Sequence, residues 1–413
     1  MLIEQRLSQR AKNLAPSPIR ELMKFMSIEG MISLGGGYPN PETFVFKRVD
    51  IEFKSGQNIR IEGKEINIAS QYGPSDAHAR LKKEIASWHK RKDGLALDES
   101  QICVLNGCQE GLVIMAYLFL NAEDTVIVCE PTYPGAISAF RAFSKNFIAI
   151  PLDADGMDTA ALEETLTTIR KSGKPLPKFI YTIPNGHNPG GVSLSPERRK
   201  HMMELANRFD LLILEDDPYQ LIKLEETPLR PTLQSLDTGG RVVRLDSFSK
   251  IFAPGLRIGY ASGPAEIVRL FVLFKQASNL HTSMLIQEML SQYLEAIGYK
   301  NFREHIEKNC SLYKTNRNAM VEAAKKYLPP QVKYNIPKEG MFIWFILPEK
   351  CDTKRMIDDY ARDLKVLLVP GSAFSTQNGL KNCMRASFSL VTPEQIGEGI
   401  RRFAEMIHRE LDN

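Results

Sequence analysis

Ser247, Ser249 and Lys250 stand within four residues of one another, and Arg257 follows shortly after them. An apolar stretch, residues 241–246, precedes these residues and is predicted to be a strand, whose carboxyl end is where open α/β sheets bind ligands. A lysine whose ammonium loses its proton readily forms an imine with a carbonyl cofactor. The two hydroxyls and the guanidinium suit a phosphate. A solvated loop lysine is the ordinary alternative, but it leaves the other three residues unexplained.

Residues 106–111, of sequence Asn-Gly-Cys-Gln-Glu-Gly, lie between an apolar strand and an apolar helix that runs to about Leu120. Backbone N–H groups at the start of such a helix point toward an anion, and the helix dipole adds to the attraction. Many strand–helix turns contain glycine, so a plain turn is an equal alternative when this segment is taken alone.

Glu215, Asp216 and Asp217 follow another apolar strand and precede Pro218 and Tyr219. A carboxylate at a strand's carboxyl end can pair with a ring nitrogen and keep it protonated, while a tyrosine can donate to a ring oxygen. Three consecutive acids are more often a solvated loop. The apolar run before them and the Pro-Tyr pair after them favour a function.

Two further segments contain groups that bind oxygen atoms. Asn188 precedes Pro189 after a predicted strand, where its amide can donate to a phenolate-like oxygen, although a Gly/Pro-rich connection is the alternative. Arg385 lies among small residues in a predicted strand and can bind a carboxylate with two parallel hydrogen bonds. Without the other segments, Arg385 would be assigned to the surface of an edge strand.

Seven short apolar runs alternate with amphipathic stretches between about residues 100 and 265. Most are apolar on successive residues, as in strands buried on both faces of a mainly parallel sheet. The pattern predicts an α/β domain in three layers. The predicted strands are Ile102–Leu105, Thr125–Cys129, Phe147–Ile150, Phe179–Ile183, Leu211–Leu214, Val242–Leu245 and Ile258–Ala261.

The pattern changes after about residue 300, where a helix (302–327) and a strand (341–347) predict a smaller α+β domain. Ser195-Pro196 and Thr392-Pro393-Glu394-Gln395 have the form of helix starts. We predict an N-terminal arm and substrate loop over 1–45, a large domain over 46–300 and a small domain over 301–413.

Composition narrows the class of protein. The 413 residues are 43% hydrophobic and 25% charged, with a formal charge of +4 and interspersed signs, which does not favour nucleic acid or membrane partners. The six cysteines contain no Cys-x-x-Cys pair, and the seven histidines show no metal-ligand spacing, so we predict no metal site. A reducing compartment, the cytoplasm, fits this cysteine usage, with the mitochondrial matrix as the alternative.

Taken in order, these segments resemble the class I aminotransferases of pyridoxal-phosphate fold type I, over nearly the whole chain. A closer resemblance is to the kynurenine/2-aminoadipate aminotransferase branch. The segments that carry it are Pro16-Ser17-Pro18-Ile19-Arg20, Ile32 to Pro41, Thr182-Ile183-Pro184-Asn185-Gly186 and Arg385-Ala386-Ser387-Phe388-Ser389. The resemblance implies pyridoxal 5'-phosphate as the cofactor, a seven-stranded large sheet and a homodimer.

The resemblance implies a role for each cofactor-binding residue. Lys250 forms the imine and serves as the general base, Asp216 pairs with the pyridine nitrogen, and Asn188 and Tyr219 bind the 3'-oxygen. Tyr133 stacks on the ring. The remaining implied contacts bind the phosphate and come from Cys108, Gln109, Ser247, Ser249, Arg257 and, from the neighbouring subunit, Tyr72.

The resemblance also implies a substrate site. Arg385 binds the α-carboxylate, beside Gly37 and Asn188, while Tyr72 and Tyr133 lie close by. Arg20 contacts the distal end of the substrate, with Tyr38 as an aromatic wall. We therefore expect donors of the 2-aminoadipate, kynurenine or aromatic type and 2-oxoglutarate as acceptor.

Two positions depart from the family pattern. Cys108 stands where serine is usual, which weakens one side-chain hydrogen bond to phosphate but leaves the backbone donors intact. Gly190 stands where threonine is usual in the Asn-Pro-Thr-Gly pattern, and His187 precedes Asn188. We expect neither to contact the reacting atoms.

Two alternatives use the same fold. A carbon–sulfur lyase would release ammonia and pyruvate from a cysteine conjugate. A pyridoxal-phosphate-binding transcriptional regulator would need an N-terminal DNA-binding domain, whereas only about forty residues, without strong basic character, precede the loop at residues 35–38.

Overall fold

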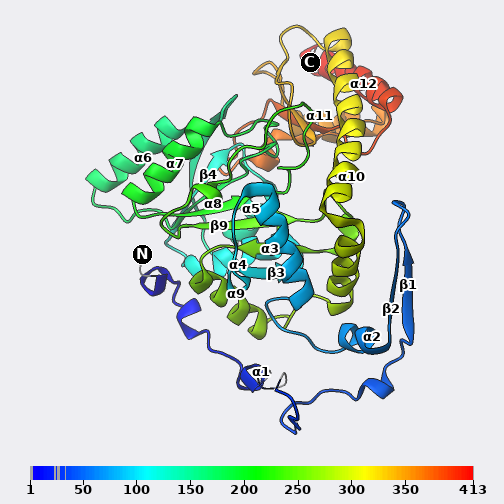
Figure 1. Cartoon of the computed structure of the whole chain (residues 1–413). Helices are drawn as coiled ribbons and strands as arrows, with labels where there is room; N and C mark the ends of the chain where they lie inside the picture. Colours follow the sequence, from blue (N-terminus) through cyan, green and yellow to red (C-terminus); the bar gives the residue numbers. More distant parts are fainter. Residues whose placement is uncertain (1–2, 23–24, 26–27, 33, 413) are drawn as a thin grey trace. The chain divides into compact units, whose positions relative to one another are not determined.

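The computed structural model describes residues 3–22, 25, 28–32 and 34–412 (Figure 1). The chain divides into two compact units, one formed by residues 1–121 and 234–305 and the other by residues 122–233 and 306–413. Each unit is described separately below. The predicted domain boundaries at residues 45 and 300 stay a prediction.

The first unit contains three buried strands in the order β3-β10-β9. β10 (Gly259–Ser262) runs antiparallel to both β3 (Ile102–Leu105) and β9 (Val242–Ser247), so β3 and β9 point the same way. α4 (Cys108–Phe119) packs on β9 and β10, and α9 (Ala265–Ala277) packs on β3. The apolar residues of these strands are buried because helices cover them.

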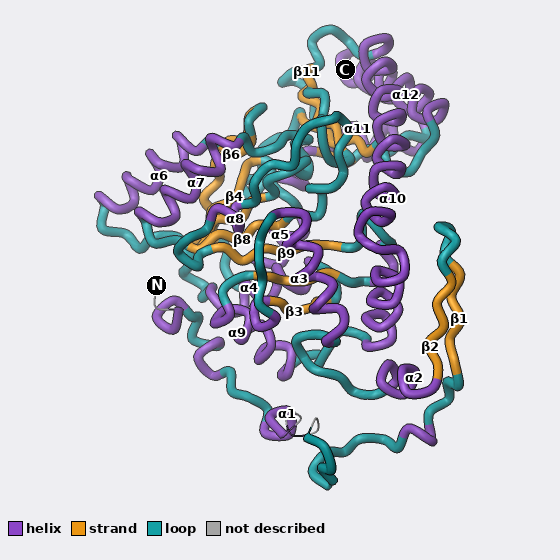
Figure 2. The backbone as a smooth tube through the Cα atoms, in the orientation of Figure 1, coloured by secondary structure: helices purple, strands orange, loops and turns teal. Residues whose placement is uncertain are grey.

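The rest of the first unit is formed by short N-terminal elements and two longer helices. β1 and β2 form an antiparallel hairpin that leads directly into α2 (Figure 2). These elements are α1 (Pro18–Leu22), β1 (Arg48–Glu52), β2 (Asn58–Glu62), α2 (Gly63–Ser70), α3 (Ala79–Asp93) and the first part of α10 (Met284–Tyr327).

The second unit contains five strands in the order β8-β7-β4-β5-β6. The first four are parallel to one another, and the two-residue β6 (Gly156–Met157) returns antiparallel to β5. The larger strands are β4 (Thr125–Glu130), β5 (Asn146–Asp153), β7 (Phe179–Thr182) and β8 (Leu212–Asp216). The helices beside them are α5 (Pro134–Arg141), α6 (Thr159–Lys171) and α7 (Pro196–Arg208). α8 (Leu233–Leu236) begins at the last residue of this stretch, and its other residues belong to the first unit.

A smaller antiparallel sheet completes the second unit, in the order β11-β12-β14-β13. Its core contains Phe345 and Phe403, whose rings lie 5.5 Å apart. The strands are β11 (Lys333–Tyr334), β12 (Phe342–Ile346), β13 (Val369–Pro370) and β14 (Cys383–Ser387), with helices α11 (Thr353–Leu364) and α12 (Pro393–Asp412).

All seven predicted strands are present, and β6 is an eighth that its two residues were too few to reveal. Both predicted helix starts are confirmed, because Ser195 Oγ accepts the Arg198 N–H at 3.3 Å and Thr392 and Gln395 cap each other reciprocally. The helix predicted over 302–327 is present as the second part of α10. An earlier helical segment from Met284 meets it at Gly298, whose φ of 70° is left-handed.

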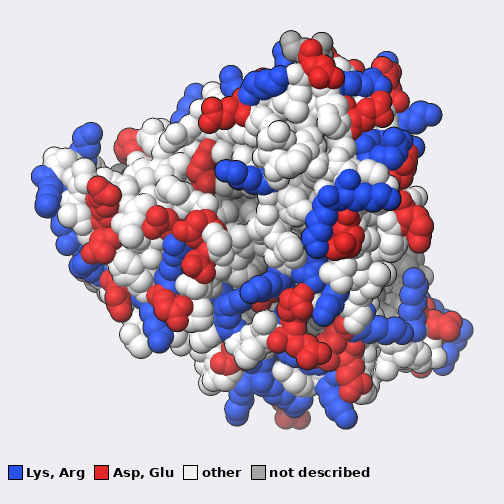
Figure 3. Space-filling view, turned by 90° about the horizontal axis from the view of Figure 1, so that it is seen from above, with Lys and Arg blue, Asp and Glu red and all other residues white. Residues whose placement is uncertain are grey.

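Surface charge is mixed, as the composition suggested. Lys and Arg alternate with Asp and Glu over the face shown in Figure 3. None of the helices in the described part of the chain has the length and apolar character needed to cross a membrane.

Candidate functional site

The predicted site residues divide between the two units. The first unit contains Arg20, Gly37, Tyr38, Tyr72, Cys108, Gln109, Ser247, Ser249, Lys250 and Arg257. The second contains Tyr133, Asn188, Asp216, Tyr219 and Arg385. The two groups are described in turn.

In the first unit, strand register brings the predicted phosphate ligands together. Ser247 pairs with Gly259, which also pairs with Leu105, so the carboxyl ends of β9 and β3 lie level. A Cβ built on Gly259 would lie 3.3 Å from the Cys108 backbone nitrogen, where α4 begins. The start of α4 and Ser247 therefore lie at one edge of the sheet, as predicted.

Arg257 reaches the same place. A Cβ on Gly107 would lie 2.5 Å from Arg257 Nη2, so a side chain there would displace the guanidinium, and the φ of 82° also favours glycine. Arg257 Nη1 also donates to the Pro254 carbonyl at 3.2 Å. A guanidinium beside the N–H groups of a helix start forms a cradle for an anion, and Gln109 lies half-buried in the first turn of that helix.

Lys250 lies in the turn that leaves β9. Ser247 Oγ accepts the Ser249 N–H at 3.1 Å, and the Phe248 carbonyl accepts the Phe252 N–H at 2.8 Å, so the turn is closed on both sides of the lysine. Lys250 is half-buried. The sequence predicted this position, in the segment that follows the strand and contains Ser247 and Ser249.

Glu110 organises the loop before α4, a role the sequence did not reveal. Its carboxylate accepts the Asn106 N–H at 2.6 Å and the side-chain amide of Asn279. Glu110 lies in the first turn of α4, where a negative side chain also interacts favourably with the helix dipole.

A buried ionic cluster lies behind the end of β9. Arg244 donates to both oxygens of Asp246, at 2.7 and 2.9 Å, and His89 Nε2 lies 2.8 Å from the Tyr260 hydroxyl. Burial alone would raise the pKa of Asp246, but the charges of Arg244, Lys92 and His89 outweigh it and lower that pKa. Sequence reasoning missed this cluster, because nothing in a helix or strand pattern shows which charged side chains point inward.

In the second unit, the three consecutive acids are buried rather than solvated, and each has its own partner. Tyr181 donates to Asp216 Oδ2 at 2.9 Å, the Asn185 amide donates to Asp217 at 2.7 Å, and Glu215 accepts the Leu233 N–H at 2.9 Å. The solvated-loop alternative is therefore wrong. Tyr181, on β7, is an addition to the predicted residues, and its hydroxyl fixes one oxygen of Asp216.

Arg385 lies beside Asn188, as predicted, and has no carboxylate partner. Its Nη1 donates to Asn188 Oδ1 at 2.8 Å, and its Cζ lies 4.3 Å from the centre of the Phe342 ring and 5.1 Å from that of Phe374. Among the residues that the structure describes, Arg385 forms no ion pair, and its buried Nε has no hydrogen-bond partner. Burial lowers the pKa of Arg385, yet a guanidinium stays charged near neutral pH.

Tyr219 and Tyr133 lie in the same part of this unit. Tyr219 is buried, with its ring edge-on to Phe342 at 5.8 Å. Burial raises the pKa of the Tyr219 phenol, as do Asp216 and Tyr133, so the hydroxyl keeps its proton and can donate it. The Tyr133 ring folds over Gly135, where an added Cβ would lie 2.4 Å from it.

The predicted substrate residues of the N-terminal arm also meet one another. Arg20 Nη1 donates to the Gly73 carbonyl at 2.7 Å, and its Cζ lies 5.9 Å from the centre of the Tyr72 ring. Tyr72 packs edge-on against Tyr38 at 6.4 Å. Gly37 lies next to Tyr38 and is exposed. The arm residues Arg20 and Tyr38 and the nearby Tyr72 therefore bring one cationic and two aromatic side chains together.

The loop that carries Asn188 is held by a buried arginine that sequence reasoning overlooked. Arg199 donates to the carbonyls of Pro184 and Leu194 and to Asn185 Oδ1, at 2.7 to 3.0 Å. The Asn188-Pro189 peptide is cis. Gly190 donates its N–H to His187 Nδ1 at 3.3 Å, so the two departures from the family pattern contact each other within the loop.

Residues 56–403 match the family described as aminotransferase class I and II. The chain belongs to this family. It is 37% identical over 408 residues to aromatic-amino-acid aminotransferase 1 of Thermococcus litoralis, which covers 99% of this chain and 95% of that protein. Over 410 residues it is 37% identical to the mitochondrial kynurenine/alpha-aminoadipate aminotransferase of Rattus norvegicus, with 95% of each covered.

Comparison with solved structures supports the same family. The kynurenine aminotransferase of Pyrococcus horikoshii, crystallised in complex with PMP, matches this aminotransferase with a TM-score of 0.79 and 35% identity, over 99% of this chain and 98% of that one. The protein is a pyridoxal-phosphate-dependent aminotransferase of fold type I, as its motifs predicted. None of the relatives named here is a lyase or a regulator.

The residues present fit this cofactor. The anion cradle beside Gly107, which a side chain would fill, suits the phosphate, and Lys250 follows on the same loop. The carboxylate of Asp216, oriented by Tyr181, suits a protonated ring nitrogen. Within the described ranges no group of three His, Cys, Asp or Glu side chains is arranged to hold a metal ion.

The buried His187 predicts a pH dependence of stability. Burial lowers its pKa to about 3, from an ordinary value of 6.5, so the folded protein keeps the imidazole neutral. The full stability is present above pH 6.5 and is lost as the pH falls toward 3, because the unfolded chain then binds a proton that the folded protein does not. We expect His187→Asn to remove about 2 kcal/mol of the loss in unfolding free energy between pH 7 and pH 5.

Denaturant unfolding at several pH values measures this effect. The control is His408→Asn, at an exposed position on α12, which should keep the wild-type pH dependence. A His187→Asn protein that loses as much stability as the wild type between pH 7 and pH 5 would contradict the prediction.

Proposed function

We propose that this aminotransferase moves an amino group from L-amino acids of the aromatic, kynurenine or 2-aminoadipate type to 2-oxoglutarate. The proposal rests on the surroundings of Arg385. Its guanidinium donates a hydrogen bond to Asn188 but has no carboxylate partner among the described residues. Both an amino acid and a 2-oxo acid supply the carboxylate that this arginine lacks. The names of the Thermococcus litoralis and rat relatives support the choice of donors.

The cofactor contacts follow from the two groups of residues. Cys108, Gln109, Ser247, Ser249 and Arg257 bind the phosphate, supported by the meeting of the α4 start, Ser247 and Arg257 at one sheet edge. The other contacts come from Lys250 at the carbonyl carbon, Asp216 at the ring nitrogen, Asn188 and Tyr219 at the 3'-oxygen, and Tyr133 on the ring face.

Bound pyridoxal phosphate supplies an electron-withdrawing ring that stabilises the charge left when the Cα proton of the donor is removed. Lys250 would be the base that takes this proton from the donor. Asp216 keeps the ring nitrogen protonated, and Tyr181 keeps the carboxylate oriented by donating to its second oxygen. Arg385 orients the donor by its carboxylate, which fixes the position of Cα.

The donor side chain is recognised by the arm residues Arg20 and Tyr38 together with Tyr72. Arg20 lies beside the Tyr72 ring, so these three residues offer a cation to a distal carboxylate and aromatic faces to a ring. Gly37, next to Tyr38, leaves space for the substrate. This mixture of groups supports a broad specificity over acidic and aromatic donors.

A homodimer is proposed, in which Tyr72 contacts the phosphate region of the neighbouring subunit. Large apolar side chains of the first unit are exposed, among them Ile32, Leu34 and Val45, with relative exposures of 85%, 96% and 89%. Several such residues in one short segment are typical of a surface covered by another chain. The second copy of this chain is the partner we propose.

The cytoplasm is the proposed compartment. All six cysteines are free thiols, and five of them are buried. Free thiols are typical of a reducing environment, which supports this location.

The role of Lys250 is tested by Lys250→Ala. We expect turnover to fall by ~10⁴-fold or more, because the base that moves the Cα proton is gone, while the cofactor still binds through the phosphate contacts. Steady-state transamination and cofactor absorbance measure the two effects. Lys83→Ala, at an exposed position on α3, is the control and should keep normal rates; near-normal turnover in Lys250→Ala would refute the assignment.

The role of Arg20 is tested by Arg20→Ala. We expect kcat/KM for 2-aminoadipate to fall by ~10- to 100-fold, with a smaller change for phenylalanine, because a hydrogen bond to a charged group is lost only with the acidic donor. A panel of donors with 2-oxoglutarate measures the ratio. Lys12→Ala removes an exposed cation from the same arm and serves as the control. An unchanged ratio in Arg20→Ala would show that another residue sets the preference.

The homodimer is tested by Leu34→Glu. We expect light scattering on a sizing column to show a shift from dimer toward monomer, because a charge would be buried in the interface. Leu390→Glu is a matched control, since Leu390 in the second unit is 94% exposed, close to the value for Leu34. A wild-type protein that elutes as a monomer would overturn the proposal.

A further inference from the structure

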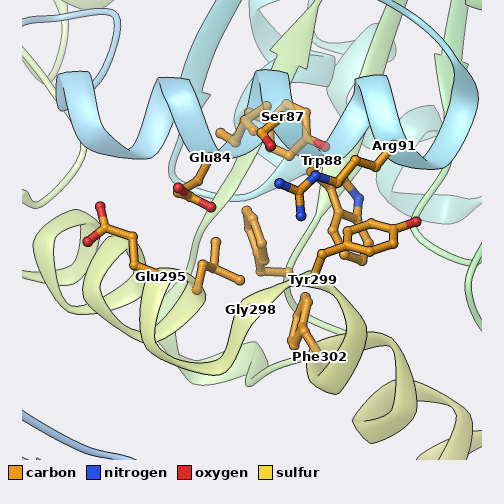
Figure 4. Close-up of a pocket in the computed structure, with 12 residues that line it drawn as sticks. Glu84, Ser87, Trp88, Arg91, Glu295, Gly298, Tyr299 and Phe302 are labelled. Atoms are coloured by element: carbon orange, nitrogen blue, oxygen red, sulfur yellow. The ribbon is translucent and has the colours of Figure 1, made fainter.

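A pocket of about 270 Å³ lies within the first unit, between α3 and the part of α10 around Gly298 (Figure 4). Its volume is near the lower end for small-molecule sites. It is separate from the predicted cofactor contacts, none of which lines it.

Five of the twelve residues that line this pocket are aromatic. The Trp88 ring lies 4.9 Å from that of Tyr299 and 5.4 Å from that of Phe302, tilted by 56° and 58°. Because α10 breaks at Gly298, Tyr299 begins a new stretch of helix directly at the pocket. Rings set at such angles leave a slot that accepts another flat ring in an edge or offset arrangement.

Two opposite charges face this slot from α3. Glu84, Trp88 and Arg91 are spaced by four and three residues, so they lie on one face of the helix. Figure 4 shows the Glu84 carboxylate and the Arg91 guanidinium both directed into the pocket. The Arg91 Cζ lies 5.6 Å from the centre of the Tyr299 ring.

Neither charge is satisfied by the protein. In the described part of the chain, Glu84 and Arg91 have no hydrogen bond or ion pair, whereas the nearby Glu295 is bound by Arg80 Nε at 3.0 Å. Burial and the charge of Glu295 raise the pKa of Glu84, and Arg91 opposes that rise. A ligand that brings a cation to Glu84 would relieve this cost.

We propose that this pocket is a second amino-acid site, which binds an aromatic α-amino acid. The ring packs against Trp88 and Tyr299, the ammonium binds Glu84, and the carboxylate binds Arg91. An aromatic amine would leave Arg91 without a partner, and an aromatic acid would leave Glu84 without one. Only a molecule that carries both charges next to a ring satisfies the three features together.

The inner wall connects the pocket to the cofactor loop. Phe248 and Tyr260 line it, and Phe248 stands between Ser247 and Ser249 in the segment that ends at Lys250. A bound ring would therefore contact the same strand end that carries the proposed phosphate ligands. Tyr260 in turn lies against the buried His89.

The fluorescence of Trp88 tests the proposal. The chain has two tryptophans, so Trp344→Phe leaves Trp88 as the only one. L-Phenylalanine is titrated into this holoenzyme after borohydride reduction, which blocks turnover. We expect a saturable change, with phenethylamine and 3-phenylpropionate each binding ~10-fold more weakly or worse.

Variants decide whether the signal comes from this pocket. Glu84→Gln and Arg91→Gln should each weaken binding by ~10-fold or more, while Lys83→Gln, next to Glu84 but outside the pocket lining, should not. Arg385→Ala should leave the Trp88 signal in place. The proposal is overturned by the absence of saturation up to ~10 mM ligand, by unchanged affinity in both pocket variants, or by loss of the signal in Arg385→Ala.

Discussion

The ion pair between Arg244 and Asp246 is the interaction on which the cofactor-binding side of the first unit depends. Both side chains are buried, and Asp246 stands one residue before Ser247. A buried carboxylate without a partner is strongly destabilising, so the pair fixes the end of β9 in the one position where both charges are satisfied. The position of Ser247, the turn after it and Lys250 follow from that end of the strand.

Three buried or half-buried arginines show how the same group serves structure or binding. Arg199 donates to the carbonyls of Pro184, Leu194 and Pro231 and to Asn185 Oδ1, and Arg244 donates twice to a neighbouring carboxylate. Arg385 instead has a single hydrogen bond to Asn188 and two aromatic rings beside it. Arg199 and Arg244 direct their hydrogen bonds to protein oxygens that they hold in place, whereas Arg385 has no carboxylate partner among the described residues. This absence of a carboxylate partner separates the binding arginine from the structural ones.

The sequence predicted the strands and the places of the site residues well, for a physical reason. Strands buried on both faces are apolar on successive residues, and each site segment begins where such a run ends, as at Ser247, the last residue of β9, and Asp216, the last residue of β8. Tyr181, His89 and Arg199 were missed because their importance comes from the direction of a side chain, which helix and strand patterns do not encode. The helical segment of α10 before Gly298 was not predicted, because the break at this glycine separates it from the helix that follows.

The acidic triplet at the end of β8 has a consequence for how this chain can vary in length. Side chains alternate between the two faces of a strand, so Asp216 lies on one face and its two acidic neighbours are directed to the other. Inserting or deleting one residue in β8 would exchange these faces and set two carboxylates where Tyr181 now meets one. An acidic run on a surface loop tolerates a change of one residue in length, whereas the buried triplet at the end of β8 does not. We therefore expect β8 to exclude the short insertions and deletions that surface loops accept.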